Sequence, residues 1–386
     1  MIWDWNLALS SGLSRGSITL MDEALIREYV NLKAARDHIS PSRVNGITSR
    51  LISFRKYLPL DYSAFRLKDL YSGVSAFLAD ENYTKNSKQS YLAAIKPFIL
   101  WLIESKKNIL GEKGSFAKVK AIKLPPPDRH VMRPEDLLTP EEIVALSDAC
   151  TNPRDRAIIW TLYESGVRIS ELGRLTWGDL SFTDVGVTAS IVDTKEDRRR
   201  IVYLVKARDY LIAWRNELGN PKGPVFVNLY GGKVKPLSIK SIARILFVLG
   251  ERAGIKKNIH PHIFRHSRIT HLVRAGAQES IIKTMMWGNT STQMFETYVS
   301  LAGTDVENEM MRISGLKKAK ARPDPTAPRV CVRCGQVNGP TINFCGKCGN
   351  PLTVEGISEE EKLFQRLLDV AKRDPGKLIE ALKKVS

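Results

Sequence analysis

The sequence predicts a mainly α-helical protein with a small antiparallel sheet, an α+β fold distributed over more than one domain. Three observations lead to this prediction. Apolar residues recur at helical spacing over 20–106 and again over 238–312. A single β-rich segment, 186–205, lies between them. The chain has 386 residues, more than one ordinary hydrophobic core accommodates, so we expect two or three folded units.

The net charge is large and unevenly distributed. The chain carries 59 Lys and Arg against 41 Asp and Glu, a formal charge of +18. Residues 201–322 hold 20 basic and 8 acidic residues, so +12 of that excess lies in one middle segment. Hydrophobic residues make up 43% of the chain, which excludes disorder along most of its length. A folded domain with a basic face suits a polyanion, and the commonest such partner is nucleic acid.

The N-terminal part, 1–110, is predicted to be a helical bundle with basic residues on its polar faces. Its apolar positions recur every three or four residues, as in Val44, Ile47, Leu51, Phe54 and Leu58, or Tyr91, Ile95, Phe98 and Leu102. Pro97 either kinks the second of these helices or marks a wrong boundary.

Residues 111–136 are basic and contain three consecutive prolines, so we expect an extended linker there.

The next domain, 137–316, begins with a clear helix start. Thr139 is a good N-cap, Pro140 suits the first helical position, and two glutamates follow. A second helix is expected over 154–164, with Gly166 as its C-cap.

The β-rich segment 186–205 has two apolar runs around a charged turn, which predicts a hairpin, and residues 224–228 are expected to add a third strand. After it, helical periodicity returns, punctuated by Gly254, Gly276 and Gly288.

Four of the five cysteines lie close together, as C-x2-C-x10-C-x2-C, and a glycine follows each pair. They are Cys331, Cys334, Cys345 and Cys348. Four thiolates at this spacing make a closed tetrahedral site for structural zinc, so residues 328–352 resemble a zinc ribbon. Two disulfides are the alternative, although nothing else in the composition indicates an oxidising compartment. Cys150 is expected to be a buried structural residue, and 353–386 to form one or two short amphipathic helices.

Several classes of protein lack support in the sequence. No apolar run reaches 18 residues, and Met1–Ser10 contains Asp4 and no basic region, so we expect neither a transmembrane helix nor a signal peptide. No phosphate-binding loop of the G-x-x-x-x-G-K-[ST] type is present, which argues against an ATP-driven motor. We therefore expect a cytoplasmic, nucleoid-associated protein without a membrane partner.

Three segments contain the candidate catalytic residues. They are ESGVRISELGRLTWGDL at 164–180, DTKEDRRR at 193–200 and HPHIFRHSRITHLVRAGAQESIIKTMMWGNTSTQMFETYVS at 260–300. Here the chain resembles the tyrosine recombinase (phage integrase) family, strongly over about 138–312. The pattern is specific because H-x-x-R-H, T-H-L, W-G-N and Tyr298 all follow G-x-R-x-S-E-L. Residues 20–110 match only as that family's expected helical core-binding domain.

The resemblance implies a catalytic set. Arg168 and Arg265 would clamp the phosphate oxygens, Tyr298 would be the nucleophile that forms a 3′-phosphotyrosine link, and Lys195 would protonate the leaving 5′-oxygen. His262 would take the tyrosine proton or bind a phosphate oxygen, and Glu171 would orient the site. No cofactor is implied for the catalysis itself.

One position departs from the family pattern. Asn289 stands where histidine or tryptophan is usual, and an amide donates hydrogen bonds but carries no proton. We expect retained, slower chemistry.

Simpler interpretations apply to each candidate residue alone. Tyr298 and His262 could be core residues, and Arg168 could be an ordinary ion-pair partner of Glu171. Lys195 could be an exposed turn lysine. His266 and His271 are left out of the site as structural, and Arg198, Arg199 and Arg200 are expected to contact phosphates or line a solvated face.

The main functional hypothesis is a site-specific DNA recombinase that performs integration, excision or dimer resolution. Its partners would be double-stranded DNA and three further copies of itself, as a homotetramer on two DNA sites. The alternatives are type IB topoisomerase-like relaxation of DNA and a catalytically silent DNA-binding accessory protein.

Overall fold

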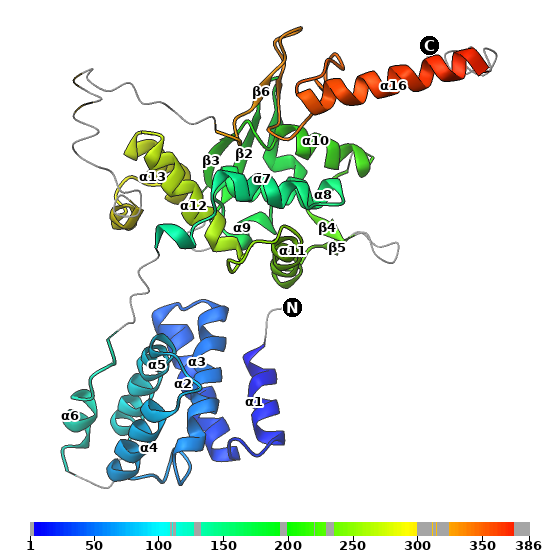
Figure 1. The fold of residues 1–386 in the computed structure, drawn as a ribbon. Coiled ribbons are helices and arrows are strands. Elements are labelled where there is room, and N and C mark those ends of the chain that lie inside the picture. Colours follow the sequence, from blue (N-terminus) through cyan, green and yellow to red (C-terminus); the bar gives the residue numbers. More distant parts are fainter. Residues whose placement is uncertain are drawn as a thin grey trace. The chain divides into compact units, whose positions relative to one another are not determined.

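The computed structural model describes residues 4–108, 110, 113–126, 133–193, 199–219, 221–228, 235–298, 311, 314 and 324–373. They belong to two compact units, Met1–Val131 and Met132–Ser386 (Figure 1). Both units are mainly helical with small antiparallel sheets in the second, so the predicted fold class is confirmed. Among the described residues, no helix is both long and apolar enough to cross a membrane.

The first unit is a bundle of helices. They are α1 (Trp5–Ser14), α2 (Leu20–Asp37), α3 (Pro41–Phe54), α4 (Leu67–Ala79), α5 (Lys85–Glu104) and α6 (Ser115–Lys120), with a 3-10 turn at Arg55–Tyr57. The positions that recur at helical spacing in the sequence form its core, and Leu51, Phe54 and Phe98 are fully buried. Helix α5 continues through Pro97, which therefore marks no boundary.

The segment after α5 differs from the extended linker that the sequence predicts. Residues Ser115–Lys120 form α6, which packs against α5, and Val119 is fully buried in the bundle core. Lys96 on α5 also donates a hydrogen bond to the carbonyl of Ile122 at 2.8 Å. The physical reason is that a few apolar residues in this basic segment, such as Val119, bury their side chains against the bundle.

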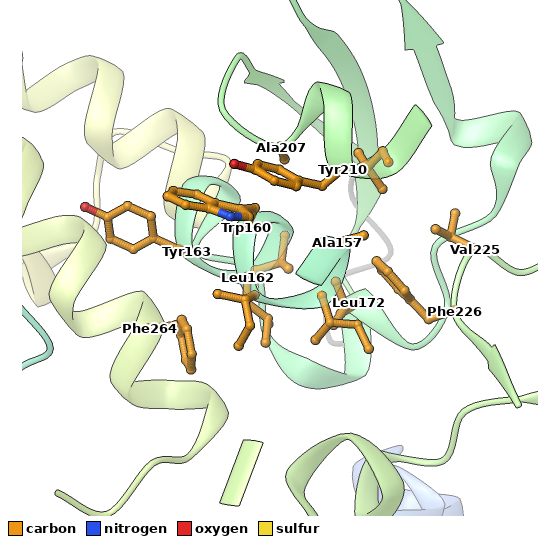
Figure 2. Packing of buried hydrophobic residues seen from close by; sticks show 14 of the residues in the cluster. Ala157, Trp160, Leu162, Tyr163, Leu172, Ala207, Tyr210, Val225, Phe226 and Phe264 are labelled. Carbon is orange, nitrogen blue, oxygen red and sulfur yellow. The ribbon is translucent and has the colours of Figure 1, made fainter. Parts of the chain in front are cut away.

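The second unit is built around one buried helix. Its helices are α7 (Pro140–Asp148), α8 (Pro153–Ser165), α9 (Ile169–Leu172), α10 (Arg208–Glu217), α11 (Ile239–Arg252), α12 (Pro261–Arg274) and α13 (Glu279–Trp287), with 3-10 turns at Pro134–Asp136, Trp177–Asp179 and Gln293–Phe295. Every residue of α8 from Ala157 to Ser165 is buried, and α7, α10 and α12 pack against this helix. Figure 2 shows its aromatic centre, where Trp160 stacks on Tyr210 with ring centroids 5.4 Å apart.

The helix boundaries follow the capping residues that the sequence predicts. The Thr139 side chain accepts from the backbone of Glu142, whose carboxylate accepts from the Thr139 N–H, and Pro140 occupies the first helical position. Gly166 ends α8 in the left-handed conformation, with φ of 59°. Both predictions are confirmed.

The predicted hairpin is present as β2 (Val187–Val192) paired with β3 (Arg199–Leu204). The third strand of this sheet is β1 (Leu180–Phe182), which pairs with β2. The sequence predicts a third strand at 224–228. Instead that strand, β4 (Val227–Asn228), pairs with β5 (Lys235–Pro236) in a separate two-stranded sheet.

The cysteine-rich segment contains a short hairpin of β6 (Arg329–Val330) and β7 (Val337–Asn338). It is followed by α16 (Val354–Arg373), a single helix of 20 residues that lies within the helical tail predicted over 353–386. Cys150, on the other hand, is 5% exposed, as expected for a structural residue.

Candidate active site

Arg168 lies where the chain leaves α8 and enters α9. Gly166 turns the backbone, and the backbone N–H of Arg168 then donates to Glu171 Oε2 at 2.7 Å, which fixes the start of α9. The Arg168 side chain bonds two carboxylates through the same nitrogen, Nη1: Glu171 Oε1 at 2.9 Å and Asp193 Oδ2 at 2.7 Å. The ion pair with Glu171 that the sequence offered as the simpler interpretation is therefore present, within a larger network.

Arg265 projects from α12 into the same region and is held by backbone carbonyls. Nη1 donates to Gly166 O at 2.7 Å and Nη2 donates to Met286 O at 2.8 Å, and the guanidinium lies 5.1 Å from the Trp287 ring centroid. Burial first, and then the neighbouring charges of Arg168 and Arg200, lower the pKa of Arg265 to about 10. Two arginines 97 positions apart in sequence thus meet at the Gly166 turn.

Arg200 is buried, whereas the sequence predicted that it contacts phosphates or lines a solvated face. Arg200 is 5% exposed. Its Nη2 pairs with Glu171 Oε2 at 2.6 Å, and its Nη1 donates to Glu171 Oε1 at 3.0 Å. Nε donates to Met285 O at 3.0 Å. Arg200 thus clamps the carboxylate that orients Arg168. The clue was available, because β3 alternates and Arg200 shares the inward face with Val202 and Leu204.

Tyr298 is 3% exposed and hydrogen-bonded to a histidine that the sequence analysis set aside. Its hydroxyl oxygen lies 2.8 Å from His266 Nδ1, and the two rings stack with centroids 5.6 Å apart. His262, by contrast, is exposed, one helical turn earlier on α12. Burial lowers the pKa of His262, as do the charges of Arg265 and Arg168, so this imidazole is neutral at neutral pH and lies close to both arginines.

Of the remaining sequence-predicted residues, Lys195 lies outside the described part of the chain, which stops at Asp193 and resumes at Arg199. Asn289 follows Gly288, the left-handed residue that ends α13, and makes local bonds: Nδ2 donates to Trp287 O at 3.4 Å and Oδ1 accepts from Ser291 at 3.4 Å.

The site can therefore hold an anion. It combines two guanidiniums in fixed orientation, one exposed neutral imidazole and a buried tyrosine hydroxyl. Guanidiniums present several N–H donors to the oxygens of a phosphate group, and a tyrosine oxygen is a nucleophile for phosphorus. The arrangement is suited to phosphoryl transfer to the Tyr298 hydroxyl.

The four clustered cysteines form a second candidate site. Their Sγ atoms all lie within 4.8 Å of one another, and the cysteines are free thiols rather than disulfides. In each C-x-x-C-G turn the glycine N–H bonds the first cysteine carbonyl, Gly335 to Cys331 and Gly349 to Cys345, both at 2.9 Å. This donor set can bind a metal such as zinc, which thiolates favour.

The cysteine segment is fastened to the domain that carries the candidate active site. Tyr210 on α10 bonds Thr341 through its hydroxyl at 2.8 Å, and Asp209 accepts from the Gly339 N–H at 2.8 Å. Lys206 donates to Thr326 Oγ1 at 2.6 Å and Asp324 Oδ2 at 3.3 Å. The appendage is thus packed against α10 and the turn that precedes it.

Comparison with known proteins points to one family. The model of the Phage integrase family matches residues 136–304, which include every candidate residue from Arg168 to Tyr298. A tyrosine recombinase XerD of Bifidobacterium longum is 32% identical over 247 residues, which cover 58% of this chain and 75% of that protein. A tyrosine recombinase XerC of Xylella fastidiosa is 29% identical over 211 residues, 52% of this chain and 67% of that protein.

Solved structures share the fold. A lambda integrase dimer bound to a COC' core site aligns with a TM-score of 0.58 at 14% identity, covering 73% of this chain and 78% of that one. A XerH recombinase in a post-cleavage complex with difH aligns with a TM-score of 0.54 at 16% identity, covering 75% and 83%.

Proposed function

The chain belongs to the tyrosine recombinase (phage integrase) family, and on that premise we propose that it cuts and rejoins DNA at specific sites through Tyr298. The observation that carries the assignment of residues is the meeting of Arg168 and Arg265 at the Gly166 turn, with exposed His262 beside both. Two guanidiniums held in this way offer fixed positive charge where the phosphorane transition state gains negative charge.

The proposed step is a balanced exchange of ester bonds. The Tyr298 oxygen bonds to phosphorus while the bond from phosphorus to the 5′-oxygen breaks, and the 3′-phosphotyrosine link conserves the energy of the phosphodiester. The phenol proton passes to a histidine, and Lys195 supplies a proton to the leaving 5′-oxygen. Rejoining reverses each transfer, with the 5′-hydroxyl of a partner strand as nucleophile.

A nicked suicide substrate tests this function. The wild-type chain is expected to become covalently trapped on the DNA, while Tyr298→Phe binds DNA but forms no adduct. Tyr163→Phe is the matched control, because Tyr163 is also buried and hydrogen-bonded to a histidine, His271, at 2.9 Å. An adduct with Tyr298→Phe, or none with the wild type, overturns the proposal.

The assembly and the broader role are proposed on the same premise. We expect four copies to act on two double-stranded DNA sites in the cytoplasm, where the nucleoid lies. An assay with two duplexes distinguishes the recombinase from a type IB topoisomerase, since strand exchange requires joining ends of different duplexes. Relaxation of supercoils without exchange would favour the topoisomerase.

For the cysteine site we propose a resident structural Zn²⁺ held by Cys331, Cys334, Cys345 and Cys348. Support comes from four free thiols within bonding reach of one ion. Native mass spectrometry is expected to find one zinc per chain and to lose it in Cys331→Ser. With four thiolate ligands the ion would have no open position, so it supplies folding energy and no catalytic step.

A further inference from the structure

Two histidines of α12 compete for the role of partner to Tyr298, and the structure separates them. His262 is exposed, whereas His266 is partly buried and lies one helical turn further along. It is His266 whose Nδ1 lies 2.8 Å from the Tyr298 hydroxyl oxygen, in a stacked arrangement with an interplanar angle of 27°. The ring centroid of Trp287 lies 6.0 Å from that of Tyr298, so the phenol is enclosed by aromatic neighbours.

The protonation states favour a phenol that donates to the imidazole. Burial first, and then the charges of His262, Arg265 and His260, lower the pKa of His266 to about 4, so the ring is neutral at neutral pH. Burial raises the pKa of Tyr298, so its hydroxyl keeps its proton. A neutral imidazole that carries its proton on Nε2 accepts at Nδ1, the atom that faces the phenol.

We propose that His266 Nδ1 is the first acceptor of the Tyr298 proton during cleavage, which leaves His262 to bind a phosphate oxygen. As the Tyr298 oxygen bonds to phosphorus, its proton moves to Nδ1 and the ring becomes an imidazolium, and rejoining returns that proton. The inference rests on the proposed function. It assigns a direct role to a residue that sequence reasoning treated as structural.

The arrival of DNA supplies the driving force. A weakly basic imidazole leaves the phenol neutral and unreactive in the free protein. A phosphate bound by Arg168 and Arg265 brings negative charge close to the ring, which favours the imidazolium and makes His266 a better base. The proton would therefore move only when substrate is in place.

The chain provides a matched control on the same helix. His271 Nδ1 lies 2.9 Å from the Tyr163 hydroxyl, and burial lowers the pKa of His271 to about 4 as well. This second pair copies the chemistry of the first, but the charges that act on His271 are those of Arg274, Arg268, Asp324 and Lys206, none of them a candidate site residue. His271→Asn therefore reports the structural cost of losing a buried histidine next to a tyrosine.

The test compares His266→Asn, His271→Asn and His262→Asn in single-turnover cleavage of the nicked substrate. A second substrate carries sulfur in place of the 5′-bridging oxygen, because a thiolate leaves without needing a proton. Asparagine can still accept a hydrogen bond from the phenol but cannot take its proton. We expect His266→Asn to slow cleavage about 100-fold on both substrates, the size usual for a lost general base, with unchanged DNA binding.

Each outcome is decisive. Cleavage by His266→Asn within threefold of His271→Asn overturns the inference, as does recovery on the sulfur substrate, which would place the defect at the leaving group. A larger loss with His262→Asn than with His266→Asn on the sulfur substrate would assign the proton to His262 instead. If the wild type itself forms no adduct, the proposed function fails, which is a separate result.

Discussion

Arg168 and Arg265 occupy one site, yet opposite kinds of partner hold them. Carboxylates hold Arg168, through Glu171 and Asp193. Backbone carbonyls hold Arg265, which is also the more deeply buried of the two. Burial alone would lower the pKa of Arg168, but its two carboxylates outweigh burial and raise it, whereas the pKa of Arg265 falls to about 10.

The two kinds of partner have different effects on the guanidinium they hold: carbonyls only orient it, whereas carboxylates also neutralise its charge. A carbonyl dipole orients a guanidinium without cancelling its charge, so Arg265 keeps a full positive charge for an incoming phosphate. The charge of Arg168 is already balanced by two carboxylates that bond its Nη1, so a phosphate must compete with them for that charge. We infer that Arg265 binds the substrate charge from the outset, while Arg168 joins as its ion pairs rearrange.

The largest effect is expected from Arg265→Lys. Lysine keeps the charge but cannot span Gly166 O and Met286 O in a planar fork. We expect adduct formation on the nicked substrate to fall about 100-fold or more, the usual cost of losing a preorganised oxyanion donor. DNA binding, measured by mobility shift, should stay within a fewfold of wild type because many phosphate contacts share it.

Arg268→Lys is the control for that experiment. Arg268 lies on the same helix and also donates to a carbonyl, Glu164 O at 3.1 Å, but lies outside the site. Equal losses in both variants would mean that α12 stability, rather than the charge at the phosphate, explains the effect.

Next in size is the stability cost of Glu171→Gln. This change leaves the buried Arg200 guanidinium without its charged partner. We expect the free energy of unfolding to fall by about 3 kcal/mol, as when one member of a buried ion pair is removed. Urea titration measures it. Glu142→Gln, which alters a partly exposed pair with Lys257, should cost under about 1 kcal/mol.

The stability lost in Glu171→Gln is also expected to depend on pH. Burial raises the pKa of Glu171, but Arg200 and Arg168 outweigh it and lower the pKa below its ordinary value. The ion pair therefore stabilises the fold fully above the unfolded-state pKa near 4.5, and this stability is lost as the pH falls through the folded-state pKa. The difference in free energy of unfolding between the wild type and Glu171→Gln should therefore become smaller as the pH is lowered. A constant difference would show that the carboxylate charge is not what Arg200 requires.

A smaller change is expected from Asp193→Asn. The carboxylate of Asp193 accepts from Arg168 at 2.7 Å and would compete with phosphate. Its removal should speed cleavage about threefold, since partly exposed ion pairs contribute about 0.5–1 kcal/mol. Single-turnover rates at saturating DNA measure this. A slower reaction would mean that Asp193 positions Arg168 rather than competing for it.

The smallest effect on cleavage is expected from chelating the metal that we propose for the cysteine site. Chelation should unfold residues 331–348, seen as new amide exchange there, and weaken the contact of Thr341 with Tyr210. Cleavage of pre-bound DNA should change less than threefold, because the appendage is attached at α10 and Lys206 rather than at Arg168 or Arg265. Loss of cleavage on chelation would show that the two sites are coupled.

The sequence was most informative where structure depends on neighbours along the chain. Thr139 and Gly166 end helices through local backbone geometry, and the hairpin follows from alternation, so these features could be predicted. The contacts of Arg200 with Glu171 and of His266 with Tyr298 join residues 29 and 32 positions apart, which no local pattern specifies. The resemblance named most of the site but not these partners, and Lys195 stays a prediction.

Gly166 has a consequence for how the site withstands motion. Its carbonyl anchors Arg265, Arg168 follows two residues later, and a Cβ at this position would lie 2.6 Å from Met286 Sδ. The positions of both guanidiniums therefore depend on the same short stretch of backbone, Gly166 to Arg168. This stretch fixes the distance between the two positive charges. When α8 and α12 shift against each other, the hydrogen bond from Arg265 to the Gly166 carbonyl is expected to keep the two guanidiniums at a nearly constant distance.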